Sequence, residues 1–95
     1  IWIVISRRTK AFHRLAVALP KDIRKKARDA YKLWQRDPKH RSLRMKKVDK
    51  EGDVWSVRID RQHRAVGVMK EGAMIWFWIG KHDEYERLLG GKGKI

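Results

Sequence analysis

The sequence VWSVRID, residues 54–60, alternates apolar and polar side chains from Trp55 to its end. Successive side chains of a β-strand point to opposite faces, so this period of two predicts a strand with one buried face. The apolar residues share that face: Trp55, Val57 and Ile59. The polar residues share the other face: Ser56, Arg58 and Asp60. The stretch therefore predicts a sheet that packs against another layer on one side.

A second strand-like stretch, AMIWFWI at residues 73–79, is apolar at every position. Such runs are typical of strands that are covered on both faces, so we expect a central, buried strand that ends at Gly80. Trp76 and Trp78 lie two residues apart in this run and are expected to belong to the core.

Two further segments complete the expected sheet. Residues 64–69 predict a strand, and Ser42–Asp49 predicts a more weakly patterned one. Turn-forming residues separate the four strands: 50–53, 61–63 and 70–72. Because the turns are short, we expect neighbouring strands to pair as an antiparallel meander.

Residues 7–36 predict a helical hairpin that is apolar on one side and basic on the other. Pro20 separates the two helices and can occupy the first turn of the second, where its missing N–H would be unpaired anyway. Ser6 or Thr9 can cap the first helix. Asp37-Pro38 ends the second, because a residue before proline avoids the helical region.

The order of these elements predicts an α+β fold. The β-branched and aromatic run Ile1–Ile5 predicts an interior strand, followed by the two-helix hairpin and the meander, with the helices packed on one face of a twisted sheet. We expect a single domain over residues 1–89, because a chain of 95 residues supports one core. It would close with a short amphipathic segment, Lys81–Leu89, and the glycine-rich residues 90–95 are expected to fray.

The chain is strongly basic, with 25 Lys and Arg against 11 Asp and Glu, a formal net charge of +14. Residues 1–50 hold 17 basic and 4 acidic residues, and residues 51–95 hold 8 and 7. This excess predicts a polyanionic partner such as nucleic acid, bound mainly by the first half. The nearly neutral second half must serve another purpose.

Composition also excludes several classes of protein. The chain has no cysteine, which excludes a disulfide framework, a thiolate zinc site and a cysteine nucleophile. Its four histidines are never four residues apart, so we expect neither a metal nor another cofactor. The longest apolar runs are too short to span a bilayer. We therefore expect a cytoplasmic protein that does not enter a membrane.

Four residues of the second half could together cleave RNA. Arg58 and Arg64 lie on adjacent expected strands, and His82 and Tyr85 follow the last strand. RNA carries its own nucleophile, the 2′-hydroxyl, so a metal-free enzyme needs a base, an acid and cations for the phosphate. Histidine can transfer protons near neutral pH, and an aromatic ring can stack on a base.

Each of these residues also has a structural interpretation. Arg58 and Arg64 would then belong to a solvated sheet face, with Asp60 as a candidate partner. His82 would order a loop, and Tyr85 would pack the C-terminal segment onto the sheet.

Short motifs occur in a fixed order along the expected strands: VWSVRI at residues 54–59, HRAV at 63–66 and IGKHDEY at 79–85. Further motifs precede them: LP at 19–20, DP at 37–38 and SLR at 42–44. Their joint order and spacing, over nearly the whole chain, resembles the RelE/ParE superfamily of bacterial type II toxin–antitoxin toxins.

The resemblance implies a compact toxin with two N-terminal helices on a twisted antiparallel sheet. Ribosome-dependent members of the superfamily cut mRNA in the ribosomal A site. The match implies that Arg58 and Arg64 are the strand cations, His82 the catalytic residue after the last strand, and Tyr85 the C-terminal aromatic residue. Further RNA contacts are expected from nearby basic residues: Arg44, Lys46, Lys47 and Lys81.

The general base stays open. Some members carry two lysines two residues apart on the strand, where this chain has Ser56 and Arg58. Others have a carboxylate before the strand pair, whereas residues 38–48 contain no acidic residue. His82 could therefore act as base or as acid, with a lysine in the other role.

We therefore expect a toxin that cleaves mRNA on the ribosome through the 2′-hydroxyl and so inhibits translation. Its partners would be the ribosome, mRNA and an antitoxin whose acidic amphipathic segment covers the site. Two alternatives remain: a ParE-like inhibitor of DNA gyrase without catalysis, and a non-catalytic basic nucleic-acid-binding domain.

Overall fold

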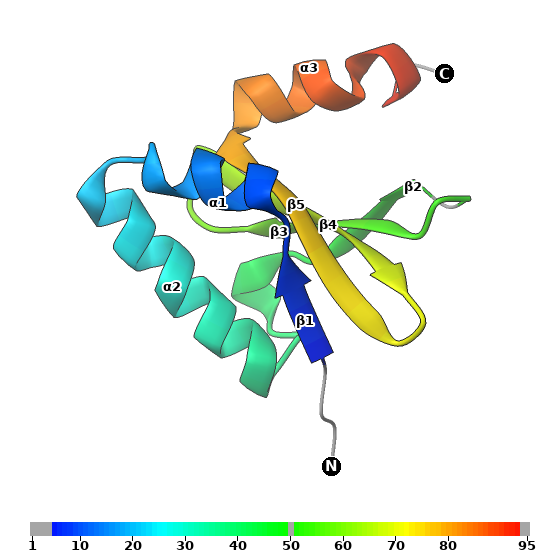
Figure 1. Cartoon of the computed structure of the whole chain (residues 1–95), viewed down its shortest axis with the longest axis horizontal. Coiled ribbons are helices and arrows are strands. Elements are labelled where there is room, and N and C mark those ends of the chain that lie inside the picture. Colours follow the sequence, from blue (N-terminus) through cyan, green and yellow to red (C-terminus); the bar gives the residue numbers. More distant parts are fainter. Residues whose placement is uncertain (1–4, 50, 94–95) are drawn as a thin grey trace.

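A computed structural model describes residues 5–49 and 51–93, and the side chains of these residues up to residue 87. Helices pack against a sheet whose strands lie in the order β1-β5-β4-β3-β2 (Figure 1). The described elements follow in chain order: β1 (Ile5–Arg8), α1 (Lys10–Val17), α2 (Lys21–Arg36), a 3-10 helix η1 (Arg41–Leu43), β2 (Lys46–Asp49), β3 (Val54–Arg58), β4 (His63–Lys70), β5 (Ala73–Lys81) and α3 (His82–Gly93).

The α+β class and the antiparallel meander are confirmed, and the sheet as a whole is mixed. Strands β2 to β5 pair antiparallel in sequence order, whereas β1 pairs parallel with β5. In the described sheet β1 therefore lies at an edge, so the expectation of an interior first strand is wrong for Ile5–Arg8; residues 1–4 lie outside the described residues. The central position belongs to β4, and β5 lies beside it.

The helical hairpin begins and ends close to where the sequence predicts. Thr9 caps α1, because its hydroxyl accepts the backbone N–H of Phe12 at 3.1 Å. Ser6 lies in β1 instead, and its hydroxyl forms a hydrogen bond with that of Tyr31. Pro20 is the N-cap of α2 rather than part of its first turn, and Asp37 caps its C-terminus.

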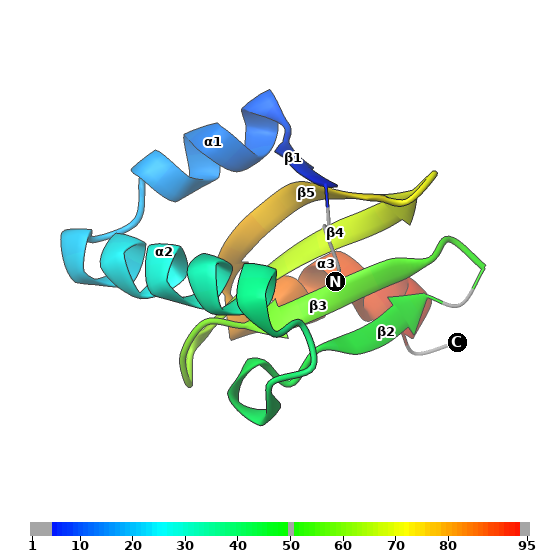
Figure 2. The ribbon, with the colours of Figure 1, turned by 90° about the horizontal axis from the view of Figure 1, so that it is seen from below.

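Both hairpin helices cover one face of the sheet (Figure 2). The buried core lies between these helices and the sheet. It consists of Phe12, Trp34, Leu43, Val57, Ala65, Met74, Trp76 and Ile79. The rings of Trp34 on α2 and Trp76 on β5 pack edge to face, with their centroids 5.2 Å apart. Aromatic pairs favour this arrangement. We refer to this side of the sheet as the helix face.

A β-bulge moves Trp78 to the opposite side of the sheet. Trp76 pairs with Gly67 and Trp78 with Val66, so the intervening Phe77 has no partner in the register. Since Val66 and Gly67 are adjacent in β4, their partners point to opposite faces. Trp78 therefore lies outside the core formed with α2 and contacts Tyr85 of α3, with ring centroids 6.2 Å apart.

Several boundaries differ from the expected ones. The expected strand at Ser42–Asp49 begins only at Lys46, because residues 41–43 form η1. Strand β5 continues through Gly80 to Lys81, and α3 continues to Gly93, past residue 89. No helix within residues 5–49 and 51–93 has the length and apolar character needed to cross a membrane.

Candidate functional site

Two arginines lie side by side on neighbouring strands, on the side of the sheet opposite the helix face. Arg58 on β3 pairs with Arg64 on β4 in the antiparallel register, and both side chains are half-buried. Directly paired residues share a face with their Cβ atoms about 5 Å apart, so two positive charges lie side by side. We call this side of the sheet the arginine face.

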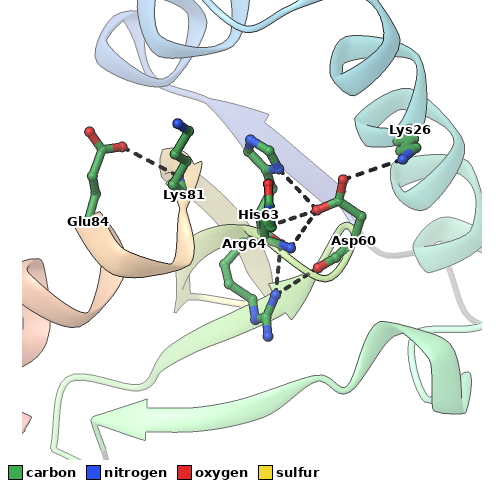
Figure 3. Close-up of polar contacts among 7 residues, drawn as sticks. Lys26, Asp60, His63, Arg64, Lys81 and Glu84 are labelled. Atoms are coloured by element: carbon green, nitrogen blue, oxygen red, sulfur yellow. Dashed lines mark hydrogen bonds and ion pairs between the residues drawn. The ribbon is translucent and has the colours of Figure 1, made fainter.

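Arg64 is held by backbone carbonyl oxygens rather than by a carboxylate. Its Nη1 donates to the carbonyl of Asp60 at 2.8 Å and to that of His63 at 3.0 Å (Figure 3). Burial and the charge of Arg58 lower the pKa of Arg64, opposed by Tyr85 and Asp60, while Arg44 lowers it further. A guanidinium remains charged in spite of such shifts, so the site carries concentrated positive charge that an anion would relieve.

His82 and Tyr85 approach this site from α3. The backbone N–H of His82 donates to the carbonyl of Gln62 at 2.5 Å, which ties the start of α3 to the turn before β4. The ring centroids of His82 and Tyr85 lie 5.9 Å apart, and the planes of the two rings make an angle of 43°. Tyr85 is buried against Trp78, whereas His82 is half-buried. The four residues expected to act together are thus drawn from three neighbouring elements.

The four expected RNA contacts divide between the two faces. Arg44 acts electrostatically on Arg64, and Lys46 pairs with Ser56, which shares the face of Arg58. Lys47 pairs instead with Trp55 on the helix face; its Nζ lies 5.8 Å from that ring and 3.4 Å from Asp53 Oδ1. Lys81 pairs with His63 and so also points away from the arginine face.

The turn expected at residues 61–63 occupies residues 59–62 between β3 and β4, and its side-chain contacts were not predicted from the sequence. One carboxylate oxygen of Asp60, Oδ1, accepts the backbone N–H groups of Gln62 and His63, both at 2.8 Å, and lies 3.0 Å from Nδ1 of His63. The other oxygen lies 3.6 Å from Nζ of Lys26 on α2. Although burial alone would raise the pKa of Asp60, the hydrogen bonds from His63 and Gln62 and the charge of His63 lower it overall.

The sequence does contain a signal for these contacts. An aspartate that begins a turn often accepts N–H groups two and three residues later, and Asp60 stands two residues before Gln62 and three before His63. What the spacing leaves open is the burial of His63, which is 4% exposed as a whole residue.

A groove of about 410 Å³ opens between α1, α2 and the helix face. Its floor is apolar, and within the described part of the chain the indole N–H groups of two floor residues, Trp34 and Trp76, are buried without an acceptor. The basic residues along it are Arg8, His13, Arg24, Arg28 and Lys32. We call this feature the helix groove. A metal site is not evident, since the described residues contain no cluster of three His, Cys, Asp or Glu side chains that could hold an ion.

Comparison with known proteins adds a family to this geometry. Residues 21–87 match the family model described as a ParE-like toxin domain. No curated protein matches the chain. The matched range includes α2, the whole meander and the four residues expected to act together: Arg58, Arg64, His82 and Tyr85.

Solved structures share the fold at low sequence identity. The RelE–RelB complex of Methanococcus jannaschii matches with a TM-score of 0.69 and 15% identity, over 85% of this chain and 95% of that one. The archaeal RelE–RelB complex of Pyrococcus horikoshii gives 0.67 and 13%, over 84% and 96%. A copper-bound mutant toxin of Helicobacter pylori gives 0.59 and 15%, over 85% and 97%.

Proposed function

The chain belongs to the ParE-like toxin domain family, in the RelE/ParE superfamily of toxin–antitoxin toxins, and from this premise we propose that it cleaves mRNA on the ribosome. The observation that carries the proposal is the arginine face, where Arg58 and Arg64 pair across neighbouring strands, Tyr85 acts electrostatically on Arg64, and the His82 ring lies next to that of Tyr85. A gyrase inhibitor without catalysis has no need of this combination.

In the proposed reaction the 2′-hydroxyl oxygen attacks the adjacent phosphorus and the bond to the 5′-oxygen breaks. Arg64 and Arg58 stabilise the negative charge that develops on the phosphoryl oxygens. His82 transfers one of the two protons, either from the 2′-hydroxyl or to the departing 5′-oxygen, and a lysine transfers the other. Tyr85 supports the His82 ring from within α3. Arg44 and Lys46 extend the positive surface along the RNA backbone.

The proposal is tested by mapping mRNA ends after controlled expression of the toxin. We expect new 5′ ends within translated regions, and their loss when the start codon of a reporter message is removed. Cells that die with intact messages and with gyrase-linked DNA breaks would support the ParE-like alternative and contradict ours.

We also propose that an antitoxin segment binds in the helix groove. Its apolar side chains would cover the floor, and its acidic side chains would pair with basic residues such as Arg24 and Arg28. Val17, which is 51% exposed, lines the same groove and would be buried by the bound antitoxin segment. The RelE structures that share the fold were solved with RelB bound.

A charge in the groove should weaken this complex. Ala27 lines the groove on α2 and is half-buried, so Ala27→Glu would put a carboxylate against an acidic partner. We expect the dissociation constant for the cognate antitoxin to rise at least tenfold, measured by calorimetry. Lys21→Glu, a larger charge change at an exposed α2 position outside the groove, should alter it far less; equal effects would contradict a groove site.

A further inference from the structure

The turn between β3 and β4 contacts both ends of the proposed catalytic site. The carbonyls of Asp60 and His63 accept hydrogen bonds from Arg64 Nη1, and the carbonyl of Gln62 accepts the backbone N–H of His82. Arg64 and His82 are separated by 17 intervening residues in the sequence. A displacement of this one turn would therefore move both.

The conformation of the turn depends on the side chain of Asp60. Its Oδ1 is within hydrogen-bond distance of three donors: the backbone N–H groups of Gln62 and His63 and the Nδ1 atom of His63. The backbone of the turn also folds onto His63, whose carbonyl accepts the N–H of Ile59 at 3.0 Å and that of Asp60 at 3.4 Å. The carbonyls that hold Arg64 are thus oriented by the Asp60 carboxylate and the His63 main chain.

His63 anchors this turn from the helix face. Its side chain is 5% exposed, and Asp60 is its hydrogen-bond partner. Burying a polar ring costs free energy unless it is hydrogen-bonded, so the ring has a strong preference for the geometry that keeps Asp60 at 3.0 Å. Lys26 of α2 adds an ion pair to the outer oxygen of Asp60.

The hydrogen bonds that hold Arg64 in place oppose electrostatic repulsion from neighbouring positive charges. Arg58 lies directly across from Arg64, and Arg44 adds a further positive charge to its surroundings. A free arginine side chain would turn away from these charges into solvent. The two carbonyls instead hold one edge of the guanidinium, and among the described residues its Nε and Nη2 atoms have no hydrogen-bond partner. Those atoms remain available to a phosphate, which suits the bidentate geometry of arginine.

We infer that Asp60 and His63 are positioning residues, which fix Arg64 and the start of α3 in the arrangement used for catalysis without touching the substrate themselves. This inference rests on the proposed RNA cleavage for its functional consequence. Its structural part, the ordering of Arg64, stands independently of any activity.

The test compares two disrupting variants with one conservative variant. His63→Leu replaces the ring by an apolar side chain that cannot bind Asp60, and Asp60→Ala removes the acceptor. His63→Asn can still present a side-chain N–H near the position of Nδ1. We expect the cleavage rate constant at saturating mRNA-programmed ribosomes to fall about tenfold to a hundredfold in the first two variants. This is the range known for residues that orient the ligands of a metal site without binding the metal. The half-saturation concentration should stay within about twofold, and His63→Asn should recover most of the rate.

A second readout needs no activity. In protein labelled with ¹⁵N-arginine, the Nε–H signal of Arg64, assigned from its loss in Arg64→Lys, should shift and sharpen in His63→Leu and Asp60→Ala as the side chain becomes mobile. It should keep its wild-type position in His63→Asn. Asp49→Ala is the matched control, because Asp49 Oδ1 accepts N–H groups of Glu51 and Gly52 in a similar turn between β2 and β3.

The outcomes separate the two proposals. An unchanged Arg64 signal in folded His63→Leu and Asp60→Ala would overturn the positioning role, whatever the activity. A wild-type protein that never cuts RNA would overturn the proposed function, while a mobilised Arg64 would still support the anchor. If Asp60→Ala fails to fold, His63→Leu decides, since leucine fills the same buried space. An equal loss in Asp49→Ala would show a general effect of turns and would contradict the inference.

Discussion

Replacing Arg64 with alanine is expected to slow RNA cleavage by about a hundredfold to a thousandfold, the loss typical for one donor removed from a developing negative charge. Arg64 is held by the Asp60 and His63 carbonyls, so its remaining N–H groups are oriented before RNA arrives. Preorganisation of this kind matters more than charge alone. The rate constant should be measured with purified toxin on mRNA-programmed ribosomes at saturating concentration.

The same substitution should leave the fold intact. Arg64→Ala removes two hydrogen bonds but also removes the burial of a cation and its repulsion with Arg58. These contributions oppose each other, so we expect the free energy of unfolding to change by no more than about 1 kcal/mol. Denaturant unfolding monitored by tryptophan fluorescence measures this directly and separates lost chemistry from lost structure.

Two further variants show whether geometry or charge is responsible. Arg64→Lys keeps the charge and loses the planar fork of donors, so its rate should lie well below that of the wild type. Lys70→Ala, at the exposed far end of the same strand, should cleave normally. Wild-type cleavage by Arg64→Ala would contradict the proposed role, and full recovery by Arg64→Lys would reduce that role to charge.

Local patterns account for the elements that the sequence predicts correctly. The alternation around Trp55 and Val57 predicts β3 and its buried face, because the period of a strand is a property of the backbone. Thr9 and Asp37-Pro38 mark helix ends through hydrogen bonds and steric restrictions within a few residues. These signals do not depend on the rest of the fold.

Features that depend on contacts between distant segments escape such patterns. The parallel pairing of β1 with β5 joins Ile5 to Ala73 and has no local signature. The bulge at Phe77 moves Trp78 to the arginine face, although its spacing from Trp76 predicts the same face for both. A shift of register by one residue inverts a strand's faces, and this is why the side taken by Lys47 could not be predicted.

The site itself divides in the same way. Strand alternation places Arg58 on the face opposite Trp55 and Val57, so its position on the arginine face is predictable. The anchor of Arg64 is not predictable in the same way, because the structural interpretation named Asp60 only as a candidate partner for both arginines and did not specify which of its groups would bind. The structure shows the backbone carbonyl of Asp60 bound to Arg64, while the carboxylate binds His63 and Lys26. Residue types predict which groups can interact, and the turn geometry decides which of them do.

Replacing His82 with alanine is expected to slow cleavage by about a hundredfold to ten-thousandfold, the contribution of a positioned proton-transfer group. The backbone hydrogen bond to Gln62 fixes the start of α3, and the ring lies 5.9 Å from that of Tyr85. Since His82 is half-buried and its side chain is not part of the core, the variant should fold. His13→Ala, an exposed histidine on α1, is the matched control and should cleave at the wild-type rate.

A modified substrate distinguishes the two possible roles of His82. If it protonates the departing 5′-oxygen, an RNA with sulfur in place of that oxygen should need no such help, because a thiolate leaves without a proton. His82→Ala and the wild type should then cleave the sulfur substrate at similar rates, while the oxygen substrate keeps the full difference. If His82 instead removes the proton from the 2′-hydroxyl, the defect should persist with both substrates. Equal cleavage of the ordinary RNA by both proteins would contradict a catalytic role for His82 and leave the two arginines as the catalytic groups of the site.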